Sequence, residues 1–291
     1  MSAEIVTIAS PELTAQIDPF GAELWALRDA DGRDLLWEGD PAWWSGRAPL
    51  LFPIICRLPE DRFVHDGRTF DLAKHGFARR RAFELVSQAS DRARFRLAAD
   101  AETRKAYPFD FVLEAEFALA GPQLTMTAEV QNRGREPMPM AFGFHPAFRW
   151  PLPGGGAREA HAIAFAEAES GPLRRLTAEG LLDAAPRANP VDGRRLALRD
   201  QLFVEDAMIF EAPASRALRF GADGGRWLSI AWAGLAHLGV WTKPGAPYVC
   251  IEPWGSLPAE AQASGPLAEM SDLAVLGPGE RQAFSMSVRL D

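Results

Sequence analysis

Phe109-Asp-Phe-Val-Leu-Glu-Ala-Glu-Phe117 carries the clearest structural pattern in the chain. Its odd-numbered positions are all apolar, and its acidic residues fall on the opposite face. Strict alternation of this kind is typical of a half-buried β-strand. Leu124-Thr-Met-Thr-Ala-Glu-Val130 repeats the pattern after the turn residues Ala120-Gly-Pro-Gln123. Together the two stretches predict an antiparallel hairpin.

Strand-like segments recur along the whole chain. Further examples are residues 92–97, 227–232, 238–241 and 284–290. The 25 glycines and 23 prolines are spread over the 291 residues and mark frequent turns. Many short strands joined by turns predict an all-β protein, built as a large antiparallel β-sandwich or a closed barrel.

Helical patterns are few and short. Residues 101–107 suffice for a turn or two, and residues 259–270 for a short irregular helix, but neither sustains an apolar stripe of helical period. The chain shows no internal repeat and no low-complexity linker. The simplest prediction is one domain over residues 1–291.

The composition is that of an ordinary globular protein, with 47% hydrophobic and 24% charged residues. A formal net charge of -8 argues against nucleic acid or an anionic membrane as the main partner. No stretch approaches the ~18 apolar residues of a membrane span, and the first ten residues lack the features of a secretory signal. We therefore expect a cytoplasmic protein, in which Cys56 and Cys250 stay reduced and act as small hydrophobic side chains.

His145 is a polar residue in a strongly apolar setting, Met140-Ala-Phe-Gly-Phe-His-Pro-Ala-Phe-Arg-Trp-Pro151. Pro146 disfavours helical backbone at the histidine, so we expect its ring on an extended segment. Gly143 leaves room for a ligand or for a second backbone segment. An imidazole held in this way either transfers protons near neutral pH or hydrogen-bonds a backbone carbonyl in the core.

A carboxylate ends a second apolar run, Tyr248-Val-Cys-Ile-Glu-Pro-Trp-Gly255. Burying an unpaired carboxylate costs several kcal/mol unless it finds a partner or its pKa rises. Glu252 is therefore either a functional carboxylate or one half of a structural ion pair with an arginine such as Arg57.

Two further stretches carry cationic or titratable side chains. Arg57 ends an apolar run, and it either caps the core as a paired cation or points into a pocket to bind oxygen atoms. His75 precedes Gly76, which predicts a tight turn that presents the ring. The arginines that follow are either a solvated face or an anion site, with Arg79 and Arg81 projecting together if the segment is extended.

These residues match no nucleophile, phosphate-loop or dinucleotide motif. Two histidines and a glutamate are zinc donor types, yet they are scattered over ~180 residues without the short spacing typical of a zinc site. We expect neither a metal nor a cofactor, which leaves acid–base chemistry. Flat indole rings suit the apolar face of a sugar, although each is also a normal core residue. The tryptophans that adjoin the polar stretches are Trp44, Trp150, Trp241 and Trp254.

Taken together, these stretches resemble the aldose 1-epimerase family of galactose mutarotase-like proteins. The motifs are Leu51-Phe-Pro-Ile-Ile-Cys-Arg57, His75-Gly-Phe-Ala-Arg79, Gly143-Phe-His-Pro-Ala-Phe148, Leu202-Phe-Val-Glu-Asp-Ala-Met-Ile-Phe210 and Cys250-Ile-Glu-Pro-Trp-Gly255. In order and spacing they cover the chain from about Trp25 to its end. The resemblance implies a large antiparallel β-sandwich that binds a sugar on a concave sheet.

The resemblance also implies a reaction. Glu252 takes the proton from the C1 hydroxyl of a cyclic aldose while His145 protonates the ring oxygen. The ring opens, the C1–C2 bond rotates, and reclosure reverses both roles. We expect the substrate-binding residues to be His75, Arg57, Asp206, Arg79 and Trp241.

The roles implied for the binding residues differ. His75 hydrogen-bonds the sugar near its reacting end, and Asp206 accepts hydrogen bonds from ring hydroxyls. Arg57 holds Glu252 or a hydroxyl.

Some positions depart from the galactose-specific members. Cys56 and Lys74 stand where those members have asparagine, and Ala207 stands where they have histidine, so the chain is closer to a divergent branch that includes hexose-6-phosphate mutarotases. The arginines at 57 and 79–81 either bind a phosphate through bidentate contacts or lie on the surface.

We expect an isomerase that exchanges the α and β anomers of an aldose or its 6-phosphate, as a monomer or a homodimer. The alternative is a carbohydrate-binding protein on the same fold without turnover.

Overall fold

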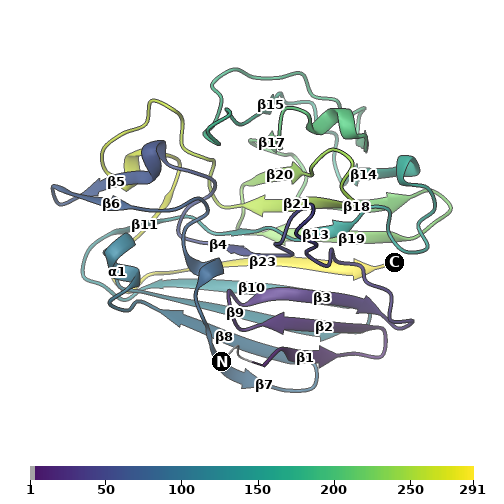
Figure 1. Cartoon of the computed structure of the whole chain (residues 1–291), viewed down its shortest axis with the longest axis horizontal. Coiled ribbons are helices and arrows are strands. Elements are labelled where there is room, and N and C mark those ends of the chain that lie inside the picture. The colour runs from purple at the N-terminus through teal and green to yellow at the C-terminus, as the bar shows by residue number, and fades with distance from the viewer. Residues whose placement is uncertain (1–3) are drawn as a thin grey trace.

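The computed structural model describes residues 4–291, which consist mostly of strands and turns (Figure 1). The largest sheet has nine strands in the order β16 (Arg195–Ala197), β14 (His161–Phe165), β18 (Ala217–Ala222), β19 (Trp227–Ala233), β23 (Arg281–Leu290), β10 (Gln123–Asn132), β9 (Phe111–Ala120), β8 (Arg92–Ala98) and β7 (Glu84–Gln88). Its pairings are antiparallel throughout.

A second antiparallel sheet carries the residues singled out above. Its order is β15 (Leu173–Arg174), β17 (Met208–Phe210), β20 (His237–Trp241), β21 (Tyr248–Trp254), β12 (Gly143–Phe144) and β4 (Leu50–Leu51), with β13 (Ala147–Arg149) also paired to β21. In Figure 1 its central strands lie above the long strands of the nine-stranded sheet.

Smaller elements complete the fold. A three-stranded sheet, β1 (Val6–Ala9), β2 (Leu13–Asp18) and β3 (Glu23–Asp29), packs on β8, β9 and β10 (Figure 1). Two ribbons pair β5 (Arg62–His65) with β6 (Arg68–Asp71) and β11 (Met138–Met140) with β22 (Ala274–Leu276). The helical elements are α1 (Thr103–Ala106) and the 3₁₀ turns η1 (Pro59–Asp61), η2 (Ala78–Arg80), η3 (Arg158–Ala160), η4 (Asp200–Phe203) and η5 (Leu267–Glu269).

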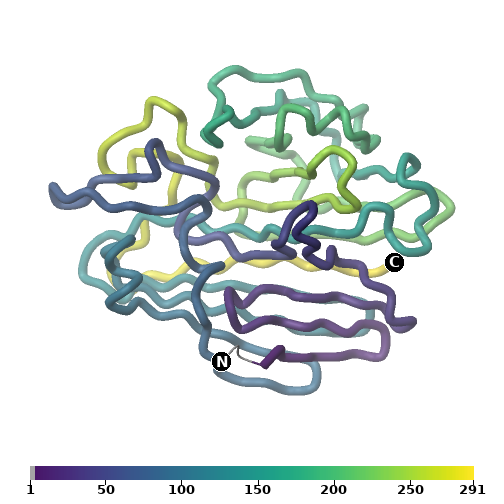
Figure 2. The backbone as a smooth tube through the Cα atoms, in the orientation of Figure 1, coloured from purple at the N-terminus to yellow at the C-terminus, as the bar shows by residue number. Residues whose placement is uncertain are grey.

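The predicted hairpin forms the centre of the nine-stranded sheet. β9 and β10 pair from Ala120 opposite Gln123 to Phe111 opposite Asn132, and their burial alternates as the sequence predicts. The C-terminal strand β23 pairs with the other edge of β10, so segments far apart in the chain lie side by side (Figure 2). The prediction of an antiparallel all-β protein is confirmed.

The apolar faces of the two large sheets share one hydrophobic core. Phe95 and Phe117 of the nine-stranded sheet belong to it, as do Val240 and Ile251 of the second sheet. Two sheets packed over a common core make a β-sandwich, which confirms the predicted architecture over that of a closed barrel. The expectation of one domain stays a prediction, and this shared core supports it.

The helical expectations are confirmed in one place and only partly in the other. α1 lies within residues 101–107. In residues 259–270 only the single turn η5 forms, because Gly265 takes a φ of 95° and Pro266 precedes the turn in extended conformation. Among residues 4–291, no helix is long and apolar enough to span a membrane.

Candidate active site

Strand β21 places Glu252 by the alternation of its side chains. Successive residues of a strand point to opposite faces. Val249 and Ile251 belong to the main core, so Cys250, Glu252 and Trp254 share the other face. On that face, Gly239 of β20 lies opposite Glu252 and leaves space for the indole of Trp254, because a Cβ there would lie 2.6 Å from the ring.

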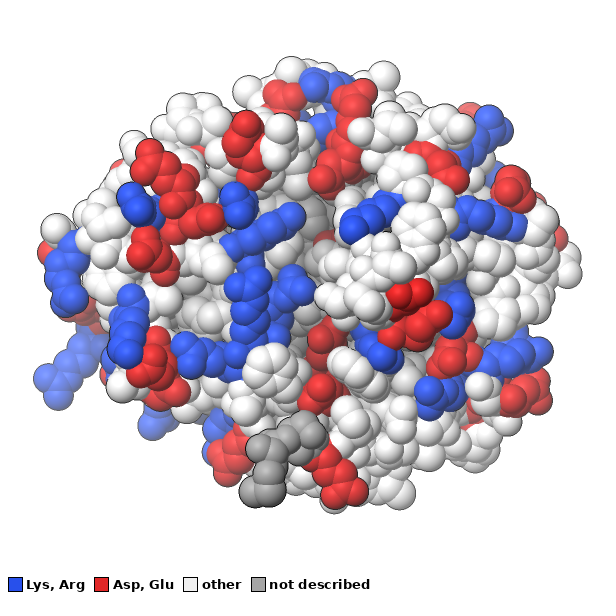
Figure 3. Space-filling view, viewed as in Figure 1, with Lys and Arg blue, Asp and Glu red and all other residues white. Residues whose placement is uncertain are grey.

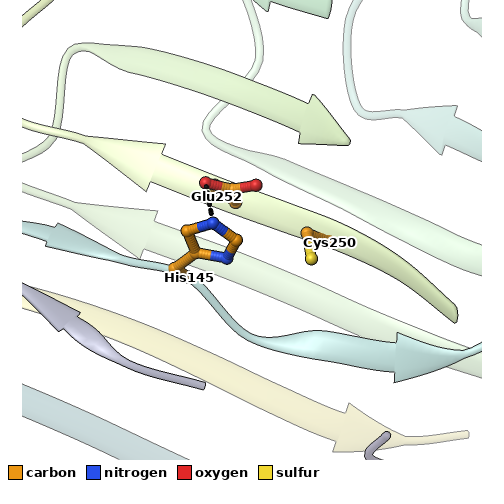
Figure 4. A group of neighbouring side chains, drawn as sticks. All are labelled: His145, Cys250 and Glu252. Atoms are coloured by element: carbon orange, nitrogen blue, oxygen red, sulfur yellow. Dashed lines mark ion pairs between the residues drawn. The ribbon is translucent and has the colours of Figure 1, made fainter. Parts of the chain in front are cut away.

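His145 lies between two short strands that both pair with β21. Gly143 is opposite Trp254, and Ala147 is opposite Cys250, so the histidine between them lies beside Glu252. Its Nε2 is 3.2 Å from Oε2 of Glu252 (Figure 4). Both side chains are buried, with 7% and 2% of their surfaces exposed. The structure therefore brings the two expected catalytic residues into direct contact.

Burial dominates the electrostatics of this pair. It raises the pKa of Glu252 to about 8, against the opposing effect of the nearby Lys74 ammonium. It also lowers the pKa of His145 to about 3, and the Arg79 guanidinium acts in the same direction. Both shifts favour the uncharged side chain. At neutral pH the pair holds one ionisable proton, which belongs to the two groups together.

Aromatic rings enclose the imidazole. Trp44 stacks on His145 with ring centroids 5.0 Å apart and planes at 27°. Trp241 meets the same imidazole edge-on at 6.0 Å. The rings restrict the orientation of His145 and shield one side of it from water.

The loop before β5 fixes the tautomer of His75. The backbone N–H of Cys56 donates to Nδ1 of His75 at 3.0 Å, and the N–H of His75 donates to the carbonyl of Cys56 at 2.7 Å. Because Nδ1 accepts, a neutral ring carries its proton on Nε2. Burial and the neighbouring His145 lower the pKa of His75 well below its usual value, so the ring stays neutral. Its Nε2–H is the donor that it can offer to a ligand.

The turn expected at His75 is confirmed. The N–H of Gly76 donates to the carbonyl of Ala73 at 2.8 Å, and His75 itself takes a φ of 63°. Gly76 is required there because a Cβ would lie 2.1 Å from the carbonyl oxygen of Phe52. The backbone is thus held close to β4, which fixes the imidazole at the site.

These residues open into one cavity of about 180 Å³. Its walls combine the catalytic pair with aromatic, cationic and apolar side chains. The lining residues are Trp44, Cys56, Lys74, His75, Arg79, Arg80, His145, Leu176, Asp206, Ala207, Trp241, Glu252 and Trp254. Figure 3 shows a hollow on this face of the molecule with Lys and Arg side chains gathered along one side.

Most of the expected binding residues line this cavity. His75, Asp206, Arg79 and Trp241 are among them. Arg57 is not, and its guanidinium lies 3.5 Å from the carboxylate of Asp61 instead. The preceding Cys56 takes a φ of 55°, which turns the chain at that point. The structure therefore brings Arg57 neither to Glu252 nor to the cavity.

Sequence reasoning did not assign a role to several lining residues. Lys74 precedes His75 in the chain, and the positive charge that it shares with the nearby arginines is the signal that could have identified it. Arg80 lines the cavity as part of the arginines at 79–81, for which either a phosphate contact or a surface position was expected. Leu176 lies in a loop with no distinguishing pattern. Of the tryptophans considered, Trp150 packs in the core and hydrogen-bonds the carbonyl of Arg158 rather than lining the cavity.

Two of the other histidines, His161 and His237, are buried away from the cavity. His161 is buried in β14, where its Nε2 accepts from the N–H of Leu152 at 3.0 Å. His237 lies 2.7 Å from the carboxylate of Asp272 and contacts a backbone carbonyl with its other nitrogen. Both rings are structural.

Comparison with known proteins agrees with this geometry. The family model described as aldose 1-epimerase matches residues 4–170. The chain is 31% identical over 265 residues to the chromosomal protein LacX of Lactococcus lactis, an alignment that covers 87% of this chain and 88% of LacX. The chain belongs to the aldose 1-epimerase family. This membership confirms the resemblance seen in the sequence.

Solved structures of family relatives share the whole fold. A galactose mutarotase-like protein from Lactobacillus casei superposes with a TM-score of 0.91 at 25% identity, over 99% of this chain and 100% of that one. A galactose mutarotase related enzyme from Lactobacillus acidophilus gives 0.92 at 29% identity, over 99% and 97%. The aldose 1-epimerase β-sandwich is therefore preserved from end to end.

Proposed function

We propose that this member of the aldose 1-epimerase family is a mutarotase that exchanges α and β anomers by acid–base catalysis. The observation that carries the proposal is the buried contact of 3.2 Å between His145 and Glu252 at the cavity. The C1 hydroxyl oxygen and the ring oxygen of a pyranose are bonded to the same carbon. An acid and a base in contact with each other can therefore reach both oxygens at once.

The single proton of the pair is enough for ring opening. Transfer of the Glu252 proton to His145 across their 3.2 Å contact gives the ionic form of the pair. The Glu252 carboxylate then accepts the proton of the C1 hydroxyl, and the His145 imidazolium donates a proton to the ring oxygen. The bond from C1 to the ring oxygen breaks, and C1 becomes an aldehyde carbon. The pair is then in its neutral form, which burial favours.

Ring closure reverses these transfers. After rotation about the C1–C2 bond, the freed hydroxyl attacks C1 from the other face of the carbonyl. His145 takes the proton of that hydroxyl, and Glu252 returns a proton to the carbonyl oxygen. The pair recovers its ionic form with no proton gained or lost, so each turnover leaves the enzyme ready for the next.

Other lining residues would position the sugar. The Nε2–H of His75 would donate to a sugar oxygen near the reacting carbon, because its tautomer is fixed by Cys56. Asp206, which lies at the mouth of the cavity, would accept hydrogen bonds from ring hydroxyls. Trp241 would cover the apolar face of the ring.

The cationic side of the cavity favours an aldose that carries a phosphate. Lys74, Arg79 and Arg80 line it together, and within residues 4–291 none of the three takes part in an ion pair with a carboxylate. Cations at a binding cavity that form no ion pair with a carboxylate are suited to an anionic ligand, and guanidinium groups bind phosphate oxygens in a bidentate way. We therefore propose a hexose 6-phosphate as the preferred substrate, ahead of the free sugar.

Magnetisation transfer between anomers tests the activity. The protein is added to equilibrated solutions of common aldoses and of their 6-phosphates. Magnetisation transfer between the C1–H signals of the α and β anomers is then measured by NMR. We expect faster exchange than in buffer, with the larger acceleration for a 6-phosphate. Exchange at the buffer rate for every sugar, together with sugar binding, would instead identify a carbohydrate-binding protein without turnover.

A further inference from the structure

Cys250 is a third potential ligand next to the catalytic pair. It precedes Glu252 by two residues on β21 and therefore points to the same face of the strand. One donor atom each from His145, Cys250 and Glu252 lie within 4.8 Å of one another, and all three residues are buried. Figure 4 shows the three side chains gathered beside β21, with the imidazole against the carboxylate.

One atom of this group has no hydrogen-bond partner. Nδ1 of His145 is buried and makes no hydrogen bond within residues 4–291. With Nδ1 unpaired, no hydrogen bond fixes the tautomer of the imidazole, so Nε2, the nitrogen that faces Glu252, can present its lone pair to a cation. Cys250 also belongs to a smaller apolar core cluster with Trp37, Ala147, Ala246 and Tyr248.

We propose that His145, Cys250 and Glu252 form a binding site for zinc or another thiophilic divalent cation, and that the bound ion blocks the catalytic pair. Imidazole, thiolate and carboxylate are donors typical of zinc, whereas magnesium and calcium prefer oxygen donors alone. Of the three residues, His145 and Glu252 line the cavity, so the fourth position of the ion would lie on the cavity side and take water or a sugar hydroxyl.

The geometry requires only a modest adjustment. Zinc bonds of roughly 2.0–2.3 Å in a tetrahedron place donor atoms about 3.3–3.8 Å apart. The pair already lies at 3.2 Å, and the third donor lies within 4.8 Å, so small side-chain rotations complete the set. Thiolate and carboxylate together carry two negative charges, which the ion neutralises, so the loaded site contains no unpaired buried charge.

Inhibition rests on the proposed function, because the ion takes the same atoms that move protons. A carboxylate bound to zinc cannot accept the proton of the C1 hydroxyl, and an imidazole bound to zinc cannot donate one to the ring oxygen. The metal-free protein is therefore the active form in this scheme, and a chelator should restore the activity.

Cobalt binding tests the site without relying on catalysis. Chelator-treated full-length protein is titrated with cobalt chloride, and the absorption band typical of cobalt bound to thiolate is recorded. We expect one cobalt per chain and a strong band in the natural protein and in Cys56→Ala, the matched control that removes the other cysteine. Cys250→Ala should lack the band. Absence of the band from the natural protein, or its persistence in Cys250→Ala, would overturn the proposal.

Zinc titration of the anomer exchange rate then tests inhibition. We expect the rate to fall to the buffer value at one zinc per chain, and we expect half-inhibition of Cys250→Ala to need at least about tenfold more zinc. Equal zinc sensitivity of Cys250→Ala and Cys56→Ala would refute the assignment. If the protein binds cobalt through Cys250 but does not accelerate anomer exchange, the proposed metal site stands and the proposed mutarotase function fails. The two proposals can therefore fail independently.

Discussion

Replacing Glu252 by glutamine should change how the stability of the protein depends on pH. The pKa of this carboxyl is raised by burial from 4.5 to about 8. Between these values the folded chain keeps a proton that the unfolded chain has released. The free energy of unfolding therefore falls as the pH rises through this window, and glutamine, which does not titrate, removes that fall.

The size of this fall in the free energy of unfolding is taken from the pH range in which Glu252 titrates and His145 does not. The pKa of His145 is lowered by burial from 6.5 to about 3, so its contribution to stability grows with pH and is complete above about pH 6.5. From pH 6.5 to 8 only the glutamate term changes within the pair. At about 1.4 kcal/mol per pH unit, it amounts to roughly 2 kcal/mol.

Urea unfolding at pH 6.5 and at pH 8 measures this difference. We expect the free energy of unfolding of the natural protein to fall by about 2 kcal/mol more than that of Glu252→Gln across the interval. Glu269→Gln, which changes an exposed carboxylate, serves as the control and should follow the natural protein. Parallel behaviour of the natural protein and Glu252→Gln would refute the buried, protonated state assigned to Glu252.

Three further changes probe the chemistry and the binding residues. Because turnover needs the one proton shared by Glu252 and His145, kcat/KM should be level near neutral pH and fall above about pH 8; a rise through pH 8 would contradict the shared-proton scheme. Arg80→Gln should raise KM for an aldose 6-phosphate by about 10- to 100-fold, from the ~1.5–3 kcal/mol of a charged hydrogen bond, with little effect on the free aldose; equal effects on both sugars would rule out a phosphate contact. Asparagine tolerates positive φ, so the His75→Asn variant should fold normally. It should raise KM by about tenfold through the loss of one hydrogen-bond donor. An unchanged KM would show that His75 does not contact the sugar.

The fold could be predicted because its strands expose one face. The alternation in β9, β10 and β23 is visible in the sequence, and it reappears as alternating burial in the structure. β21 is different, since all seven of its residues are buried and hydropathy does not distinguish its two faces. Only its pairing with β20 and its packing show that Glu252 points away from the main core.

The candidate site depends on contacts between distant segments, which limits what local patterns can predict. Pro146 correctly indicated extended backbone at His145, but the approach of that residue to Glu252 follows from the pairing of β12 and β13 with the same strand. Arg57 shows the limit most clearly. The apolar run before Arg57 is compatible with a cation that faces a pocket. The positive φ of Cys56, which hydropathy does not reveal, turns the chain just before Arg57, and the guanidinium pairs with Asp61.

Charge at the cavity was also only partly predictable. Arg79 was expected as part of an anion site or a solvated face, and the structure places it in the cavity wall with Lys74 and Arg80. Lys74 lies in the same turn as His75, and Arg79 and Arg80 lie in the short η2 segment that follows. Periodicity gives no information there about which way the side chains point. Their common orientation becomes visible only once Gly76 has brought the turn against β4.

Proton exchange of Glu252 and His145 with a sugar is the basis of the proposed function, and one rate constant measures it. The anomer exchange rate is measured by NMR for the natural protein and for Glu252→Gln at the same concentration, with the variant shown to be folded and to bind the sugar. We expect a loss of about 10²- to 10⁴-fold in the variant. Equal rates for the two proteins would contradict it.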